Sequence, residues 1–175
     1  QDNLLLYGMT SSGKTTQFGE MAKWVYKSRK QKSKLSTCDR GGYDSIAPLV
    51  RLGIVEVNEL GEKDAPWIWI NNAVGGAESE EIGLEGFDSG TSMGDILLTA
   101  CSHADFQIGQ QRTQKFNVSK GGTNLTVAIN NEAHYGVVQG FMLDAIWKST
   151  WLTRKDIDVI WTFGEYRGEE QDRTP

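Results

Sequence analysis

The most informative segment of this chain is Gly8-Met9-Thr10-Ser11-Ser12-Gly13-Lys14-Thr15. It matches the pattern G-x-x-x-x-G-K-[ST] at every fixed position. Residues 3–7 before it form an apolar run that predicts a short buried strand. Residues 16–29 after it carry apolar side chains at helical spacing, namely Phe18, Met21, Ala22, Val25 and Tyr26. The chain is therefore expected to begin with a strand, a glycine-rich turn and a helix.

The glycine-rich turn has the properties of the phosphate-binding loop of P-loop NTPases. Gly8 and Gly13 allow tight folding around a phosphate, so that backbone N–H groups and the helix N-terminus face the anion. Lys14 would reach the β- and γ-phosphates, and the Thr15 hydroxyl would bind Mg²⁺. The alternative is a glycine-rich turn that matches by chance. The residues predicted to bind ATP are Gly8, Met9, Thr10, Ser11, Ser12, Gly13, Lys14, Thr15 and Thr16.

The composition is that of an ordinary globular protein. Of the 175 residues, 38% are hydrophobic and 23% are charged, and the net charge of −5 argues against extensive coating of nucleic acid. No apolar run approaches the roughly 20 residues of a membrane-spanning helix. Cys38 and Cys101 are far apart, which argues against a disulfide framework or zinc ribbon and fits a reducing cytoplasm. We expect one domain over residues 1–175, belonging to a longer protein whose C-terminal part lies outside this chain.

Further strands and helices alternate along the chain. Apolar runs predict strands at residues 35–38, 54–57, 67–70 and 159–163, with a weakly apolar one at 82–87 at the end of a glycine- and glutamate-rich connection. Helical spacing marks residues 45–52, 91–103 and 132–151. Residues 107–131 alternate apolar and polar side chains around a Gly-Gly turn, which predicts an inserted β-hairpin. The pattern predicts an α/β fold with a mostly parallel sheet.

A P-loop requires a second acid to hold Mg²⁺ through water, and Asp88 is the best candidate. It follows the strand at 82–87, which is expected beside the P-loop strand, and it precedes Ser89 and a helix. The alternative is that Asp88 caps that helix. Asp88 and Thr15 are therefore the predicted metal-binding residues.

Three further segments resemble the RecA-like recombinase ATPases in order and spacing. The stretch from Ser36 to Ser45 resembles the family's second strand and the acid at its end, which falls on Asp39; Phe87-Asp88-Ser89 resembles its Walker B motif. Near the end, Glu165 stands where the family usually has a glutamine that senses the γ-phosphate, and Arg167 follows. The resemblance implies a three-layer α/β/α RecA-like core in which Asp39 activates the attacking water, with Lys14 and Glu165 as further catalytic residues. Asp39 alternatively serves as a turn residue.

The hairpin lies where RecA-like proteins place their first DNA-binding loop. Arg112, Lys115 and Lys120 are basic, and Phe116 offers a ring for stacking on a base, which predicts contact with single-stranded DNA. Alternatively, the hairpin packs on a neighbouring subunit.

The closest resemblance is to the short RecA-like ATPases of bacteriophages that serve recombination or single-strand annealing. It implies an ATPase that uses ATP and Mg²⁺, forms a homo-oligomeric ring or filament, contacts no membrane and acts in the cytoplasm of a bacterial host. The alternatives are a nucleoside or nucleotide kinase and a nucleotide-locked assembly ATPase of a phage particle. His103 and His134 are read as ordinary polar helix residues, and Trp67, Trp69, Trp147, Trp151 and Trp161 as core residues.

Overall fold

The computed structural model describes residues 2–9, 11–39, 41–61, 64–75, 81–103, 107–108, 111–112, 114–120, 123–129 and 132–164. The elements in chain order are β1 (Asn3–Gly8), α1 (Lys14–Arg29), β2 (Lys32–Thr37), η1 (Asp44–Ile46), α2 (Ala47–Arg51), β3 (Val55–Glu59), α3 (Pro66–Gly75), β4 (Ile82–Asp88), α4 (Gly90–His103), β5 (Gln107–Ile108), β6 (Gln111–Arg112), β7 (Gln114–Lys120), β8 (Thr123–Ile129), α5 (Glu132–Ser149), η2 (Thr150–Lys155) and β9 (Asp158–Gly164). Strands alternate with helices, as expected from the sequence.

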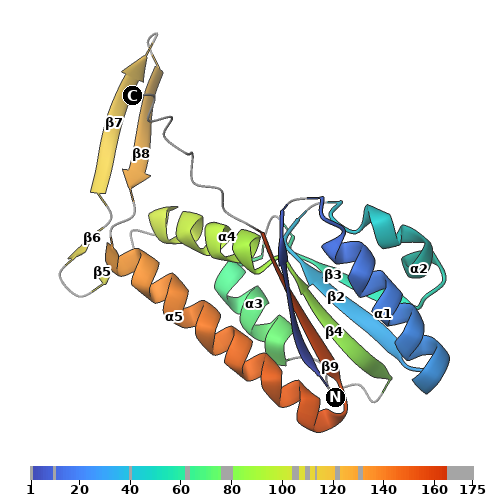
Figure 1. Ribbon diagram of the computed structural model, residues 1–175. Coiled ribbons are helices and arrows are strands. Elements are labelled where there is room, and N and C mark those ends of the chain that lie inside the picture. Colours follow the sequence, from blue (N-terminus) through green and yellow to red (C-terminus); the bar gives the residue numbers. More distant parts are fainter. Residues whose placement is uncertain are drawn as a thin grey trace, which may run out of the picture.

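Five strands form one sheet in the order β1-β9-β4-β2-β3, and every neighbouring pair is parallel. Helices α1 and α2 cover one face of this sheet, and α3, α4 and α5 cover the other (Figure 1). The protein is therefore an α/β protein with an all-parallel sheet between two helical layers. Because parallel strands end at the same side of a sheet, the carboxyl ends of β1, β2, β4 and β9 lie at one edge.

Each face of the sheet has its own hydrophobic core. On the α1 side, the buried residues are Phe18, Ala22, Val25, Leu35, Ile46, Leu49, Val55, Leu84 and Ile160. The core on the other side is larger, and α3, α4, α5, η2, β4 and β9 contribute to it. Every residue of β4 is buried, so the weakly apolar segment predicted at 82–87 is a central strand. Its glycines are required, because a Cβ at Gly86 would lie 2.4 Å from the Phe18 ring.

The expectation that the first strand is buried is wrong. In the described part of the chain β1 lies at the edge of the sheet, where it pairs with β9. Leu5 is 62% exposed and Tyr7 is 64% exposed. An apolar strand reads the same in the centre of a sheet and at its edge, since strand order is set by long-range pairing that local sequence does not report.

The strand predicted at residues 67–70 is also wrong, because this segment is the start of α3. The run of tryptophan and isoleucine has high β-propensity, which misled the prediction. The helix instead begins at Pro66, and it buries Trp69, Ile70, Ala73 and Val74, which recur at helical spacing. Packing against the sheet therefore overrides the local preference of these residues.

The expected core position is confirmed for Trp161 and Trp69, but it is wrong for Trp147 and Trp151. These two side chains are 65% and 49% exposed, on the outer side of α5 and in η2. His134, expected to be an ordinary polar residue, is fully buried. Apolar residues at helical spacing predict a helix, but they do not show which faces of that helix other elements will cover.

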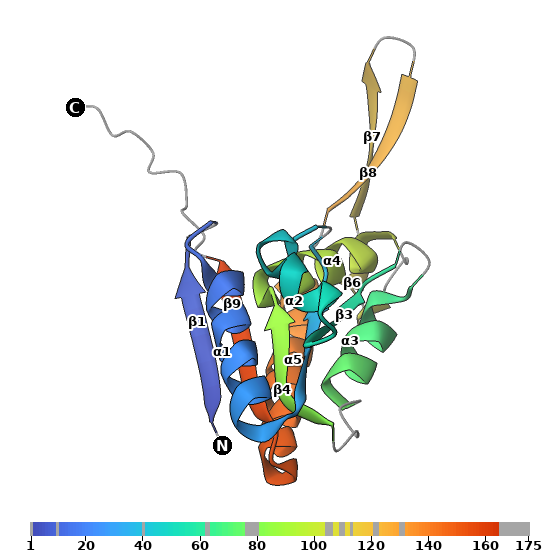
Figure 2. The same cartoon turned by 90° about the vertical axis from the view of Figure 1, so that its right-hand side faces the viewer.

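The predicted hairpin at 107–131 is confirmed as a backbone feature. β7 and β8 pair antiparallel from Gln114 opposite Ile129 to Lys120 opposite Thr123. In Figures 1 and 2 this hairpin projects beyond α4, away from the five-stranded sheet. The side chains of the hairpin lie outside the described residues. No helix in the described part of the chain is long and apolar enough to cross a membrane.

Candidate functional site

The loop after β1 has the backbone geometry of an anion-binding turn. Gly13 has a φ of +86° and Ser11 a φ of +64°, so both residues are in the left-handed region. The helix α1 then begins at Lys14 with no side-chain cap at Gly13 and no acidic residue in its first turn. No acidic residue of α1 itself therefore offsets the positive end of the helix dipole, which faces the loop and favours an anion such as phosphate.

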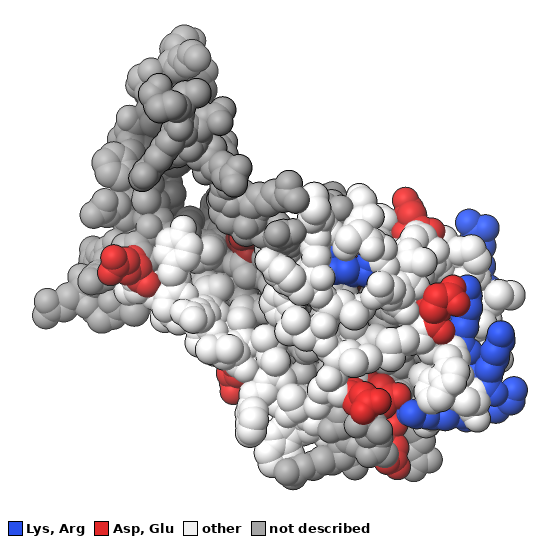
Figure 3. All heavy atoms as spheres, in the orientation of Figure 1, with Lys and Arg blue, Asp and Glu red and all other residues white. Residues whose placement is uncertain are grey.

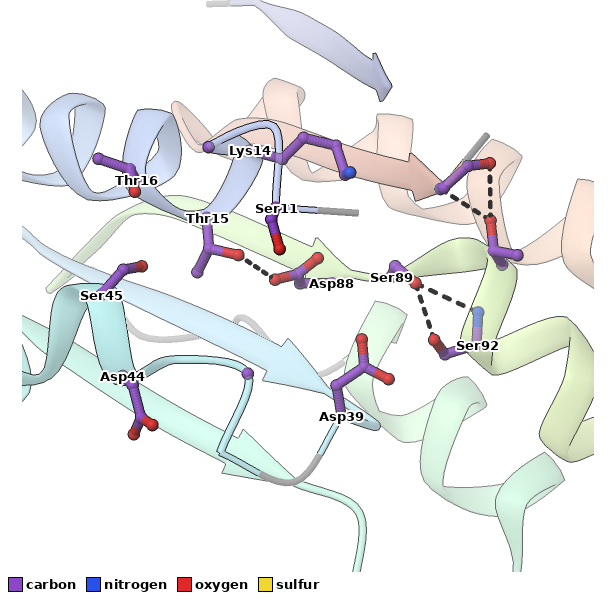
Figure 4. Close-up of a pocket in the computed structure, with 14 residues that line it drawn as sticks. Ser11, Lys14, Thr15, Thr16, Asp39, Asp44, Ser45, Asp88, Ser89 and Ser92 are labelled. Carbon is purple, nitrogen blue, oxygen red and sulfur yellow. Dashed lines mark hydrogen bonds between the residues drawn. The ribbon is translucent and has the colours of Figure 1, made fainter. Parts of the chain in front are cut away.

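The Lys14 ammonium bends back over this loop. Its Nζ atom donates hydrogen bonds to the carbonyl oxygens of Gly8, at 2.9 Å, and Met9, at 2.8 Å. The residues of the loop thus hold the charge above the turn, on the same side of the site as the start of α1 (Figure 4). If a phosphate bound at this position, the Lys14 ammonium would donate to its charged oxygens in place of the neutral carbonyls. Such hydrogen bonds are stronger.

Asp88 lies opposite the P-loop and is held by two hydroxyl groups. Thr15 Oγ1 donates a hydrogen bond of 2.7 Å to Asp88 Oδ2, and Thr162 Oγ1 donates one to Asp88 Oδ1. The structure therefore brings together the two residues predicted to bind Mg²⁺. The expectation that the strand of Asp88 lies beside the P-loop strand is wrong, however, because β9 lies between β1 and β4. Thr162 comes from this intervening strand, and it orients the carboxylate from the side opposite Thr15.

The alternative role of Asp88 as a helix cap is taken by its neighbour. The backbone N–H of Ser92 donates to Ser89 Oγ at 3.2 Å, so Ser89 caps α4. At the end of β9, the Gly164 N–H donates to Thr91 Oγ1 at 2.9 Å, which ties the start of α4 to this strand. Asp88 is therefore left to face the pocket.

Asp39 follows β2 at the same edge of the sheet and lines the same pocket as Lys14 and Asp88. Its carboxylate points into the pocket, toward the side that holds Asp88 and Ser89 (Figure 4). Its backbone carbonyl accepts a 3.0 Å hydrogen bond from the Gly42 N–H, so the residue also forms the predicted turn. Burial, together with the charge of Asp39, raises the pKa of the adjacent Cys38 thiol to about 12. Cys38 therefore remains a neutral thiol, packed against the hydrophobic core.

These residues enclose a cavity of about 550 Å³, within the range of small-molecule binding sites. The lining residues are Ser11, Gly13, Lys14, Thr15, Thr16, Asp39, Gly42, Asp44, Ser45, Asp88, Ser89, Thr91, Ser92 and Gly164. Lys14 lies on the P-loop side of the cavity, Asp88 lies beside the P-loop at the Thr15 hydroxyl, and Asp39 and Asp44 come from the segment after β2 (Figure 4). The lining residues therefore combine one lysine with three carboxylates.

The sequence prediction missed several members of this site. Thr162 is the clearest of them, because it is a hydroxyl residue within the apolar strand β9 and is 1% exposed. A polar residue in a buried strand requires a hydrogen-bond partner, and this signal was available in the sequence. Thr91 and Ser92 were read only as part of a helix. Of the predicted residues, Thr10 and Glu165 lie outside the described residues, as do Arg167 and the side chains of Arg112, Lys115, Phe116 and Lys120.

The residues present fit a magnesium–nucleotide complex. A hydroxyl and a carboxylate supply hard oxygen atoms of the kind that Mg²⁺ prefers, and the open helix N-terminus and Lys14 fit a chain of phosphates. No protein-family model matches this chain, and no curated protein matches its sequence. The assignment of the site therefore depends on its geometry and on the motif.

Proposed function

We propose that this chain is a RecA-like P-loop ATPase that binds ATP with Mg²⁺ and acts on single-stranded DNA in recombination or annealing. The observation that carries the proposal is the meeting of three segments at one edge of the sheet. The P-loop after β1, Asp39 after β2 and Asp88 at the end of β4 line one cavity, although they are far apart in the sequence. This is the arrangement that the motif resemblance requires.

Each residue has a separate role in this proposal. The N–H groups of the loop and the Lys14 ammonium bind the phosphates and stabilise negative charge that develops on the γ-phosphate. Thr15 and Asp88 hold the metal, which would neutralise phosphate charge when bound. Asp39 accepts a proton from the water that attacks the γ-phosphorus, while the bond from that phosphorus to the bridging oxygen breaks and ADP leaves. Thr162 positions Asp88 and is not itself a catalytic residue.

The DNA part of the proposal depends on the motif resemblance and on the hairpin, whose backbone projects from the body of the molecule as a binding loop would (Figure 2). The basic residues Arg112, Lys115 and Lys120 are its expected contacts with phosphates. The motif resemblance also supports the ring or filament that is expected of such ATPases.

ATP turnover with and without single-stranded DNA tests this function. We expect hydrolysis that requires Mg²⁺ and rises when DNA is added, with the effect of DNA declining as salt concentration increases. An Arg112→Ala/Lys115→Ala/Lys120→Ala variant should retain the basal rate and lose the stimulation. Hydrolysis that DNA does not change would contradict the DNA role. Transfer of phosphate to a nucleoside would instead identify a kinase, and tight ATP binding without turnover would favour the assembly-lock alternative.

A further inference from the structure

Helix α5 is apolar on two sides, and only one of them is covered. Its buried side faces the core through His134, Val138, Met142, Ala145 and Ser149. On the exposed side, Tyr135, Leu143, Trp147 and, in η2, Trp151 recur at multiples of four residues, with exposed fractions between 49% and 65%. We call this row the α5 ridge. Exposed rows of large apolar side chains on globular proteins mark interaction surfaces.

Two glycines lie beside the α5 ridge, and the described residues give no packing reason for them. Gly136 and Gly140 are exposed positions within α5, and a Cβ added at either would meet none of the described atoms within 4 Å. Glycine inside a helix is less favourable than alanine, and no contact among the described residues offsets this. They leave a shallow gap along one side of the ridge, into which a large side chain from another helix fits.

The ridge and the gap match each other when two copies of α5 lie antiparallel. Gly136 and Gly140 are four residues apart, and Trp147 and Trp151 are also four residues apart. In an antiparallel pair whose two-fold axis passes between Leu143 and Asp144, Trp147 of one copy faces Gly140 of the other. Trp151 lies in η2, just beyond the end of α5 at Ser149, on the side toward Gly136. The symmetry forms the contact of Trp147 with Gly140 twice. Since small residues allow two helices to approach closely, large rings opposite glycines give a well-packed interface.

The charges on this face permit such self-pairing. Lys148 Nζ lies 2.8 Å from Asp144 Oδ2 and also donates to Asn71 Oδ1 at 3.3 Å, so the two charges beside the ridge neutralise each other within one chain. In Figure 3 the face seen in the orientation of Figure 1 is mostly uncharged, and Lys and Arg gather over the α1 end. Two copies that meet through this face therefore bring no net like charges together.

We propose that α5 forms a two-fold, antiparallel dimer contact with α5 of a second copy of this chain, through the α5 ridge and the glycines beside it. A two-fold contact uses the same surface on both copies, so by itself it closes a dimer; a ring or filament of the kind proposed above would use a different surface. The contact does not involve the nucleotide pocket. It therefore goes beyond the proposed function and stands or falls separately from it. Each exposed aromatic ring presents on the order of 100 Å², which places the contact below a standard stable interface and makes the expected dimer weak and concentration-dependent.

Sedimentation velocity over a wide range of protein concentration tests the proposal. We expect a concentration-dependent monomer–dimer equilibrium, which Trp147→Ser/Trp151→Ser weakens at least tenfold. The matched control is Trp24→Ser, which removes a tryptophan that is 57% exposed on α1, away from the ridge, and should leave the dimer unchanged. Gly140→Gln is the sharper variant, because it favours the helix and fills the gap. It should leave thermal stability equal or higher while removing the dimer.

Three results would overturn the proposal. The first is a protein that remains monomeric at all concentrations up to hundreds of micromolar. The second is a dimer that Trp24→Ser weakens as much as the double tryptophan variant. The third is a dimer that Gly140→Gln leaves intact, since antiparallel packing of α5 cannot accommodate a long side chain at that position. Circular dichroism of each variant would verify that the helix content is preserved.

Discussion

Two carboxylates of strand β4 are three residues apart and have opposite surroundings. Asp88, at the end of the strand, accepts hydrogen bonds from Thr15 and Thr162 and faces the pocket. Glu85, in the middle of the strand, is 0% exposed, and its Oε2 atom is buried with no hydrogen-bond partner. Parallel strands thus place polar side chains at their carboxyl ends, where they can bind a ligand. The same chemical group inside the sheet destabilises the folded protein. Changes at the edge should alter ligand handling, and changes inside should alter stability.

The environment of Glu85 has a direct electrostatic consequence. Burial raises the pKa of this carboxyl group from 4.5 to about 8, although the Lys34 charge and a hydrogen bond from Ser36 act in the opposite direction. The Ser36 hydroxyl lies 3.3 Å from Glu85 Oε1, and Lys34 Nζ lies 3.7 Å from it. Near neutral pH the group is therefore mostly protonated, in contrast to a carboxylate that binds a metal.

The largest effect is expected for Asp39→Asn. In the proposed mechanism this change removes the base that accepts a proton from water, so kcat should decrease by about 10²–10⁴-fold while ATP affinity stays the same. Asp44→Asn is the matched control, because Asp44 lines the same cavity but its carboxylate points away from Lys14 and Asp88 (Figure 4). Steady-state turnover and equilibrium binding would be measured for both variants. Equal turnover by the two would remove Asp39 from its proposed role.

Lys14→Ala should reduce ATP affinity by about 100-fold, since the phosphates lose their charged hydrogen bonds. Thermal stability should change little, because the ammonium is bound only to loop carbonyls in the hydrogen bonds described above. Lys23→Ala removes an exposed lysine of the same helix that pairs with Glu20, and it controls for loss of charge on α1. Fluorescence titration with a labelled nucleotide measures both. An unchanged affinity in Lys14→Ala would show that the loop does not bind phosphate.

Asp88→Asn should weaken Mg²⁺ affinity in the nucleotide complex by about 10–100-fold, the usual effect of losing an outer ligand of a metal. Thr162→Val removes the hydroxyl that orients this carboxylate, and it should produce a smaller effect in the same direction. A magnesium titration of ATP binding would rank the variants. If Thr162→Val weakened Mg²⁺ more than Asp88→Asn, the proposed hierarchy of the two residues would be incorrect.

The smallest effect on ligand binding is expected from Glu85, because its contribution concerns stability alone. Because the folded pKa is raised, the folded protein holds a proton that the unfolded chain releases above about pH 4.5. The free energy of unfolding should therefore decrease, by a few kcal/mol, as pH rises from about 4.5 to about 8, and then level off. Glu85→Gln should flatten this dependence without changing ATP affinity. Glu81→Gln, at an exposed side chain, should leave it in place.

Much of the fold could be predicted from the sequence because local signals and packing agree. The P-loop, α1 and the helices after Ser89 and Glu132 have caps, glycines or apolar spacing that match their final positions. The errors in strand order occur where only long-range pairing decides. β1 and β9 have similar apolar composition, yet β1 lies at the edge and β9 is inserted between β1 and β4. Nothing in either strand reports this order.

The prediction of the site depended on sequence motifs, so it found the residues that belong to motifs and missed the others. Lys14, Thr15, Asp39 and Asp88 belong to motifs whose spacing follows from strand–loop–helix geometry, and these residues line one cavity. Thr162 and Thr91 belong to no motif, because they act by orienting groups contributed by other strands. The sequence marks Thr162 as a polar residue in an apolar strand, but the partners of both threonines become visible only when the register between distant strands is known.

A calorimetric titration of the protein with ATP, ADP and AMP in the presence of Mg²⁺ tests whether the cavity is a nucleoside triphosphate site. We expect ATP and ADP to bind, because the loop and Lys14 hold the β- and γ-phosphates, and AMP to bind at least about 100-fold more weakly. If AMP bound as tightly as ATP, or if none of the three bound, the cavity at the edge of the sheet would not be a nucleoside triphosphate site.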